Sequence, residues 1–260
     1  MAKTIAIVNQ KGGVGKTTTT FNLGASLVRQ GKRVLLVDLD QQGNLTFCMG
    51  YDSPEELDKT IAQIMLQVIE DTDYDINDYI QTRNGMDYIG CNIYMSAVEI
   101  NLVNAISREL ILKGILYELQ EKYDYILLDC GPSLGMITIN ALAAADSVII
   151  PLQAEKLAEI GLELLIKNIL RVKRKLNPAL EIEGILFVSV PTNQNDPKKT
   201  IQTVQDKYGE VVKVYDYIIP RLTEVAKANR SQRAMLEFDE KSIISGLYGK
   251  LAEEVMNNGR

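Results

Sequence analysis

The sequence of 260 residues contains no histidine and only three cysteines. The absence of histidine excludes Ser-His-Asp catalysis and zinc sites built on imidazole. The cysteines, Cys48, Cys91 and Cys130, are widely scattered and match neither a disulfide framework nor metal-ligand spacing. Their distribution is typical of a protein from a reducing compartment.

Long apolar runs are also absent. No apolar stretch approaches the roughly 20 residues that a membrane span needs. The first residues lead directly into a strand-like run, so we expect no signal peptide. No internal repeat and no Gly/Ser-rich linker divides the chain. We therefore expect a single cytoplasmic domain, residues 1–260, with no membrane partner.

The chain has no excess of positive charge, since 28 Lys/Arg against 34 Asp/Glu give a formal net charge of −6. This balance alone argues against a nucleic-acid partner. The charge is unevenly spread, however, because residues 165–235 contain 13 Lys/Arg against 7 Asp/Glu. We call residues 165–235 the basic region, and it keeps a nucleic-acid partner open.

Short apolar runs alternate with longer amphipathic ones, which indicates an α/β fold with a mostly parallel sheet and helices on both faces. Near-continuous apolar runs such as "VLLVD" and "YILLD" suit strands that are covered on both faces. The predicted strands are Thr4–Val8, Val34–Val37, Met86–Ile89, Tyr125–Leu128, Ser147–Ile150, Ile185–Val190 and, more weakly, Val214–Ile218. The predicted helices are Lys16–Gln30, Pro54–Glu70, Ala97–Lys122, Leu134–Ala144, Glu155–Leu176, Pro197–Tyr208 and Ser242–Met256.

A glycine-rich loop, "IAIVNQKGGVGKT" at residues 5–17, joins the first strand to the first helix. It departs from the phosphate-loop pattern G-x-x-x-x-G-K-[ST], because Gln10 replaces the first glycine and Lys11 is an additional lysine. Glycines permit backbone conformations and close approaches that side chains would block. Their N–H groups, with the positive end of the following helix, form a nest for phosphate oxygens. The loop residues predicted to bind the nucleotide are Gly12, Gly13, Val14, Gly15, Lys16, Thr17 and Thr18.

Each polar side chain of this loop has a predicted contact. Lys16 would neutralise the β- and γ-phosphates, the Thr17 hydroxyl would hold Mg²⁺, and Thr18 would bond to an α-phosphate oxygen. The alternative, a glycine-rich turn with incidental lysines, does not account for the strand–loop–helix setting. The sequence therefore predicts a phosphate-binding loop.

Two acidic strand ends support a metal–nucleotide site. "YILLD" ends in Asp129, in the manner of a Walker B carboxylate that contacts Mg²⁺. Asp38 and Asp40, in "VDLD", stand at alternate positions and project from the same side of their strand. Because carboxyl ends of parallel strands face the ligand crevice, we expect these acids and the loop to converge there.

Three longer segments are similar to the ParA/Soj partition ATPases, of the deviant Walker A class that includes MinD. They are "KGGVGKTTTTFNLGASLVRQGKRVLLVDLDQQGNLT", "YDYILLDCGPSLG" and "IIPLQAEKLAEIGLELL". The likeness extends through essentially the whole chain, including "AVEINLVNAISREL" and "IIPR". It implies a P-loop NTPase three-layer sandwich with about seven or eight strands, and slow hydrolysis of ATP with Mg²⁺.

The resemblance assigns further roles around the phosphates. Lys11 would reach across an ATP-bound homodimer to the partner's phosphates, while Lys16 serves its own nucleotide. Asp40 would activate the attacking water, and Asp38 would support the metal shell formed by Thr17 and Asp129. Gly131 stands where relatives usually have proline, and its N–H would donate to the γ-phosphate. On the base side, the resemblance implies contacts from Asn193, Pro220 and Arg221.

The resemblance also implies that the dimer binds double-stranded DNA non-specifically, associates with the nucleoid, and releases DNA when a ParB-like partner stimulates hydrolysis. The chain departs from the family here, because Asn193 and Glu224 occupy two positions that usually carry arginine. Other basic side chains offer compensation, four of them on one helix face. They are Lys167, Arg171, Arg174 and Lys175, followed by Lys198, Lys199, Lys227, Arg230 and Arg233. The alternative for this stripe is a solvated basic face.

Other functions within the superfamily remain to be weighed. A regulatory or positioning ATPase, for conjugation or another cargo, would not need direct DNA binding, and the missing arginines favour it. A MinD-like membrane positioner needs a basic amphipathic C-terminal helix, whereas "SGLYGKLAEEVMNNGR" carries Glu253 and Glu254. An iron–sulfur ATPase needs paired cysteines, and Cys130 is better interpreted as a small buried residue.

Overall fold

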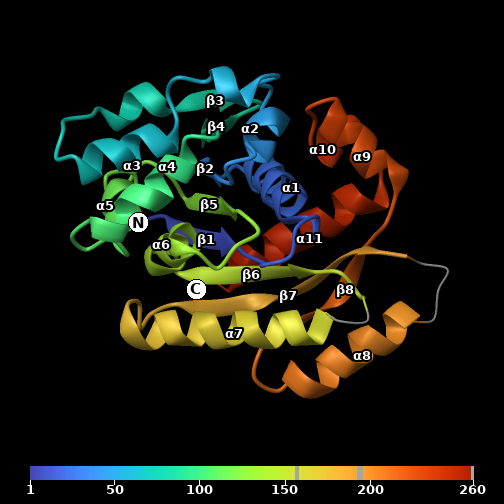
Figure 1. The fold of residues 1–260 in the computed structure, drawn as a ribbon. Helices are drawn as coiled ribbons and strands as arrows, with labels where there is room; N and C mark the ends of the chain where they lie inside the picture. Colours follow the sequence, from blue (N-terminus) through green and yellow to red (C-terminus); the bar gives the residue numbers. More distant parts are fainter. Residues whose placement is uncertain (156–157, 192–195, 259–260) are drawn as a thin grey trace.

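The computed structural model describes residues 1–155, 158–191 and 196–258. Its centre is an eight-stranded sheet with the strand order β3-β4-β2-β5-β1-β6-β7-β8 (Figure 1). All neighbouring strands pair in parallel except β3 and β4, which are antiparallel. The strands are β1 (Lys3–Ile7), β2 (Val34–Leu39), β3 (Gln81–Arg83), β4 (Met86–Ile89), β5 (Tyr125–Cys130), β6 (Ser147–Leu152), β7 (Glu181–Val190) and β8 (Val214–Pro220). The predicted P-loop α/β sheet is thus confirmed, and β3 is the strand that was missed.

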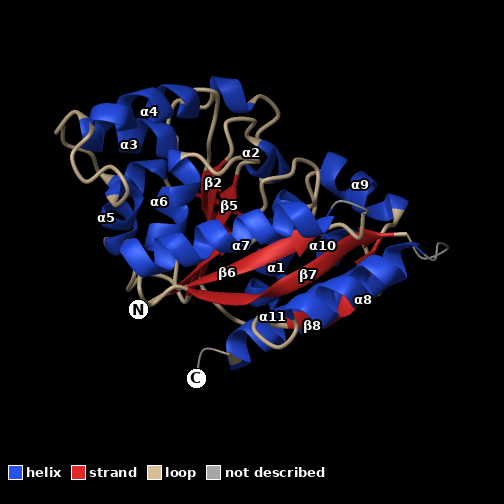
Figure 2. Ribbon diagram, turned by 60° about the horizontal axis from the view of Figure 1, so that its bottom comes forward, coloured by secondary structure: helices blue, strands red, loops and turns tan. Residues whose placement is uncertain are grey.

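Helices cover both faces of the sheet (Figure 2). One face packs against α1, α10 and α11, and the other against α3 and α5–α8. The α-helices are α1 (Lys16–Arg29), α2 (Asn44–Cys48), α3 (Ile61–Ile69), α4 (Met95–Asn101), α5 (Ile111–Tyr117), α6 (Met136–Ala144), α7 (Ala158–Lys175), α8 (Asp196–Tyr208), α9 (Thr223–Arg230), α10 (Met235–Phe238) and α11 (Ile243–Asn257). Short 3₁₀ turns are η1 (Pro54–Glu56), η2 (Ile76–Tyr79) and η3 (Leu102–Asn104). Among the described residues, no helix combines the length and apolarity needed to cross a bilayer.

Two long helix predictions are wrong. Residues 54–70 form η1 and then α3, because Thr60 is extended and caps α3 in a reciprocal capping box with Gln63. Residues 97–122 break between η3 and α5, where Ser107 has a positive φ of 51°. Asn140 of α6 stabilises this break by donating to the Arg108 carbonyl at 2.7 Å and accepting from the Leu112 N–H at 3.1 Å. Contacts from a distant helix therefore override the local periodicity.

The start of β7 also differs from the prediction, since the strand begins at Glu181 and not at Ile185. Glu181 pairs in register with Ser147 of β6, so the sheet extends into a charged stretch. Glu183 is buried there and forms a 2.9 Å ion pair with Lys3 of β1. A prediction based on apolar runs does not detect a strand that contains a buried, paired charge.

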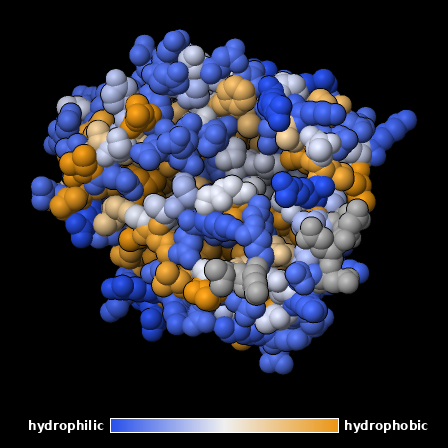
Figure 3. Space-filling model, turned by 45° about the vertical axis from the view of Figure 1, so that its right-hand side comes forward, coloured by the Kyte–Doolittle hydropathy of each residue, from blue (hydrophilic) through white to orange (hydrophobic). Residues whose placement is uncertain are grey.

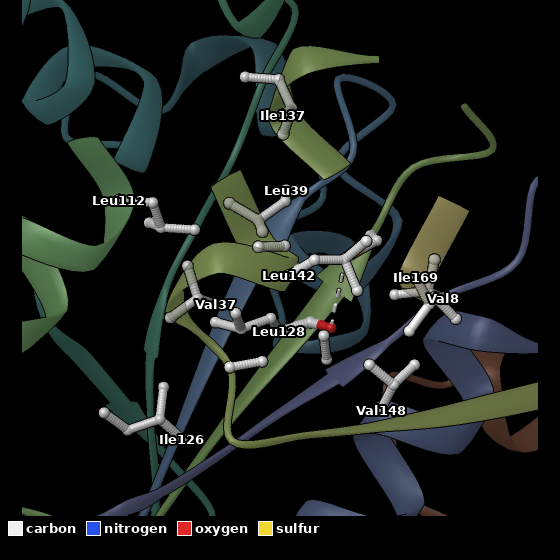
Figure 4. Packing of buried hydrophobic residues seen from close by; sticks show 14 of the residues in the cluster. Val8, Val37, Leu39, Leu112, Ile126, Leu128, Ile137, Leu142, Val148 and Ile169 are labelled. Atoms are coloured by element: carbon white, nitrogen blue, oxygen red, sulfur yellow. Dashed lines mark hydrogen bonds between the residues drawn. The ribbon is translucent and has the colours of Figure 1, made fainter. Parts of the chain in front are cut away.

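A continuous apolar core fixes the carboxyl ends of the central strands. Val37 and Leu39 of β2 and Leu128 of β5 point toward Leu142 of α6 (Figure 4). Every residue of β2, β5 and β6 is buried. Because these strands cannot shift without breaking the core, the polar residues at their ends are held rigidly.

Candidate nucleotide-binding site

The glycine-rich loop lies between β1 and α1, at the carboxyl edge of the sheet. Gly13 and Gly15 have φ values of 71° and 81°, a left-handed conformation that favours glycine. A Cβ on Gly15 would also lie 3.3 Å from Val188 Cγ2. Gln153, the residue after β6, also holds the loop, because its side-chain amide donates to the Gly13 carbonyl at 2.9 Å. Its conformation is therefore set before a ligand arrives.

Lys16 is buried within this loop, with 6% of its surface exposed. Its ammonium group donates to the Lys11 carbonyl at 3.2 Å. Burial lowers the pKa of Lys16, while the negative charge of Asp129 opposes that shift. A phosphate group would supply the strong anionic partner that the buried ammonium needs.

Asp129 and Thr17 form the predicted metal-binding pair. Asp129 is fully buried and accepts hydrogen bonds from the hydroxyls of Thr17 at 2.7 Å and Thr20 at 3.3 Å. Burial, and secondarily the charge of Asp38, raise the pKa of Asp129 well above its usual range. A cation would favour the charged carboxylate, and hydroxyl and carboxylate oxygens are ligands that Mg²⁺ accepts. The described residues hold no cluster of three or more acidic, cysteine or histidine ligands, so phosphates and water would complete the coordination.

Asp38 lies beside Asp129 in the register of β2 and β5. Its carboxylate accepts the Asp40 N–H at 3.0 Å and both the N–H and the hydroxyl of Thr46, at 2.9 and 2.8 Å. Burial raises the pKa of Asp38 to about 6. Asp38 thereby fixes the backbone of Asp40 and the short helix α2, and its part in the metal shell stays a prediction.

Asp40 lines a cavity of about 530 Å³, together with Lys16 and Thr17. Its carboxylate accepts the Gln42 N–H at 3.1 Å and is 8% exposed as a residue. A Cβ placed on Gly131 would lie 3.6 Å from the Asp40 carboxyl carbon, so the two predicted residues face each other. We call this space the phosphate cavity.

A smaller cavity of about 260 Å³ adjoins the phosphate cavity and shares Gly13, Gly15, Thr18 and Asn229 with it. Pro220 and Arg221, which were predicted to contact the base, line this second space. We call it the base cavity. The third predicted base contact, Asn193, lies outside the described residues.

Comparison with known proteins shows the family to which the chain belongs. A family model described as "AAA domain" matches residues 2–182. The sporulation initiation inhibitor protein Soj of Bacillus subtilis is 42% identical over the full length of both chains. The chain belongs to the ParA/Soj family of partition ATPases. It therefore binds ATP with Mg²⁺ and hydrolyses ATP.

Solved structures with bound nucleotide support the family assignment. The chain superposes with a TM-score of 0.86 on Mycobacterium smegmatis cobyrinic acid a,c-diamide synthase with ADP and magnesium, at 34% identity and covering 100% and 97% of the two chains. A plasmid partition protein of Borrelia burgdorferi bound to AMPPNP gives a TM-score of 0.78 at 27% identity, covering 99% and 100%. Both structures are thus similar to this ParA/Soj-family chain over nearly its whole length.

The additional lysine of this ParA/Soj-family chain lies outside its own phosphate cavity. Lys11 forms an ion pair with Glu155, which follows β6. Both side chains are more than half exposed. Lys11 is absent from the lining of the phosphate cavity, although its backbone carbonyl accepts a hydrogen bond from the Lys16 ammonium group. The two lysines of the loop therefore face different surroundings.

The predicted DNA-binding residues fall into two groups. The α7 and α8 residues are exposed on one side of the sheet, while Arg230 and Arg233 belong to the α9–α10 segment on the other side. Lys167 is already paired with Glu163 at 2.8 Å. The first group comprises Lys167, Arg171, Arg174, Lys175, Lys198 and Lys199. The two groups are therefore carried by elements that pack on opposite faces of the sheet.

Several residues of the site were not found from the sequence. Thr46 and Glu155 contact predicted site residues, and Asn229 and Arg230 line the phosphate cavity. The short elements α2 and α9 bring Thr46, Asn229 and Arg230 there, and both were missed because five and eight residues are fewer than the stretch over which periodicity is read. Cys130, in contrast, is buried as expected.

Proposed function

We propose that the chain forms a homodimer around two ATP molecules, binds DNA non-specifically in that state, and releases it when a ParB-like partner stimulates a slow intrinsic hydrolysis. The observation that carries this proposal is the position of Lys11. Its ammonium group lies outside the cavity that holds Lys16, although both residues belong to one loop. A cation excluded from its own phosphates is available to those of a second chain, where it would act as an arginine finger does.

An exposed apolar segment beside the site supports a dimer. Ile93, Tyr94, Ile100 and Val103 are each more than half exposed, in and around α4 and η3. Separate apolar patches are visible among hydrophilic side chains on the face shown in Figure 3. Helix α4 adjoins the loop after β5, since a Cβ on Gly135 would lie 2.8 Å from Glu99 Oε1. Burial of this segment by a second copy would link nucleotide state to association.

DNA binding is tested by its salt dependence in the presence of Mg²⁺ and an uncleavable ATP analogue. If about four phosphates are neutralised, DNA affinity should fall roughly 100-fold between 50 and 200 mM salt. The double substitution Arg171→Gln and Arg174→Gln should reduce the log–log slope by about 2, because each arginine would release about one counterion. Fluorescence anisotropy of labelled duplexes with unrelated sequences measures both effects.

A regulatory ATPase that does not bind DNA directly is the second candidate. The separation of the basic side chains onto two sides of the sheet favours it. Absence of DNA binding, or a DNA affinity that does not change with salt concentration, would support the regulatory ATPase over the DNA-binding one. Substitution of Lys241, an exposed lysine outside the basic region, serves as the control for a loss of charge.

The Lys11–Glu155 pair gives a further prediction for the same model. Glu155→Gln removes an ion pair that a free chain must break before Lys11 reaches a partner. Exposed pairs contribute about 0.2–1 kcal/mol each, and each chain of the dimer breaks one, so dimerisation with the uncleavable analogue should tighten by roughly 2- to 30-fold. Sedimentation velocity measures the dissociation constant, with Glu163→Gln on α7 as the matched control. A weaker dimer would show that Glu155 contributes to the interface itself.

A further inference from the structure

The end of α9 lies against the phosphate-binding loop, although 211 residues separate Asn229 from Thr18. The Asn229 amide donates to the Thr18 hydroxyl oxygen at 3.0 Å. Asn229 lines both the phosphate cavity and the base cavity, and Arg230 lines the phosphate cavity alone. Helix α9 thus closes the site on the side where the two cavities meet.

Arg230 is the second basic residue, with Lys16, in the lining of the phosphate cavity. Its side chain is exposed, and in the part of the chain that the structure describes no carboxylate lies within ion-pair distance of it. Arg233, three residues later, differs in this respect. Its guanidinium donates to the Glu237 carbonyl and lies over the Phe238 ring, 5.9 Å from its centroid.

We propose that Arg230 binds the polyphosphate of ATP within its own chain. Mg²⁺ and Lys16 neutralise only part of a triphosphate's charge, and a guanidinium can offer two parallel donors to phosphate oxygens. This assignment replaces the DNA contact expected for Arg230 from the sequence. It depends on ATP binding, which the family establishes, and is independent of dimerisation and DNA binding.

The neighbouring Asn229 acts as a positioning residue for Thr18. A hydroxyl has a single proton to donate. Because Thr18 accepts the Asn229 amide proton, its own proton is free for an α-phosphate oxygen. The side-chain carbonyl oxygen of Asn229 is buried without a hydrogen-bond partner among the described residues. Burial of an unpaired oxygen costs free energy, and the hydrogen bond from the Asn229 amide to Thr18 is formed despite that cost. The hydrogen bond between Asn229 and Thr18 would thereby connect α9 to the phosphate-binding loop when nucleotide is bound.

Isothermal titration calorimetry of Arg230→Gln with Mg²⁺ and AMPPNP, ADP or AMP tests the proposal. Loss of a charge-assisted contact should weaken AMPPNP binding by about tenfold or more, and ADP binding to a smaller or equal extent. AMP, which has no polyphosphate, should bind as it does to the unmodified chain. Arg230→Lys should recover part of the affinity because it retains the charge.

Arg233→Gln is the matched control, and its nucleotide affinities should not change. Unchanged AMPPNP affinity in Arg230→Gln would overturn the proposal, as would an equal loss for AMPPNP and AMP. Normal nucleotide affinity combined with weaker DNA binding would return Arg230 to the DNA surface and also overturn it. Failure of DNA binding in every variant, with the expected nucleotide affinities, would contradict the DNA proposal alone.

Discussion

Replacement of Lys11 by alanine should leave ATP affinity close to that of the unmodified chain and lower hydrolysis by about 10³-fold or more. The binding contacts survive because Lys11 serves its own cavity only through a backbone carbonyl, which alanine retains. Hydrolysis should fall because, in the proposed dimer, Lys11 is the cation that stabilises charge on the transferred phosphoryl group. Calorimetry measures the affinity, and single-turnover phosphate release measures the rate.

A mixing experiment separates action within one chain from action between chains. Lys11→Ala and Asp40→Ala should each be inactive alone. In a mixed dimer, the Asp40→Ala chain supplies its intact Lys11 to the Lys11→Ala chain, whose own Asp40 is intact. Partial recovery of hydrolysis on mixing is therefore expected. No recovery, or normal hydrolysis by Lys11→Ala alone, would refute the transfer of this lysine between chains.

Asp40→Ala should bind ATP and accumulate as a dimer while hydrolysis falls by about 10²- to 10⁴-fold, the range for loss of a general base. Asp40 is fixed from two sides, because Asp38 accepts its N–H and its own carboxylate accepts that of Gln42. An acceptor is thus fixed in the lining of the phosphate cavity, where it could take a proton from an attacking water. Light scattering during a hydrolysis time course follows the dimer and the reaction together.

Asp40→Asn is the matched variant for this second prediction. Its amide oxygen can keep the hydrogen bond from the Gln42 N–H, but it cannot take a proton. It should therefore be as inactive as Asp40→Ala with less disturbance of the loop. Normal turnover in Asp40→Asn would exclude proton abstraction by this residue.

The phosphate-binding loop was predictable because the residues that would bind phosphate lie close together in the sequence. Glycines with forced backbone angles, Lys16 and Thr17 lie within a few positions of each other, and the strand before them ends in the apolar run Ile5-Ala6-Ile7. Asp129 was predictable for a related reason, since an apolar strand ending in an acid has few other meanings at a sheet edge. Their convergence required only that the strands be parallel.

The residues that were missed depend on contacts distant in sequence. Asn140, which belongs to α6, stabilises the break in the helix expected over residues 97–122. No residue within that segment predicts the break. Asn229 reaches Thr18 through α9, a helix of only eight residues that was not predicted from the sequence. Such contacts are set by how elements pack, so local pattern carries no signal for them.

The burial of all three cysteines has a practical consequence. Burial raises the pKa of each thiol, that of Cys48 to about 12 and those of Cys91 and Cys130 well above the ordinary value. The reactive thiolate is thus scarce at neutral pH, and the sulfur atoms are shielded from reagents. A fluorophore or spin label attached to an engineered surface thiol would report on that site alone, with the natural cysteines left in place.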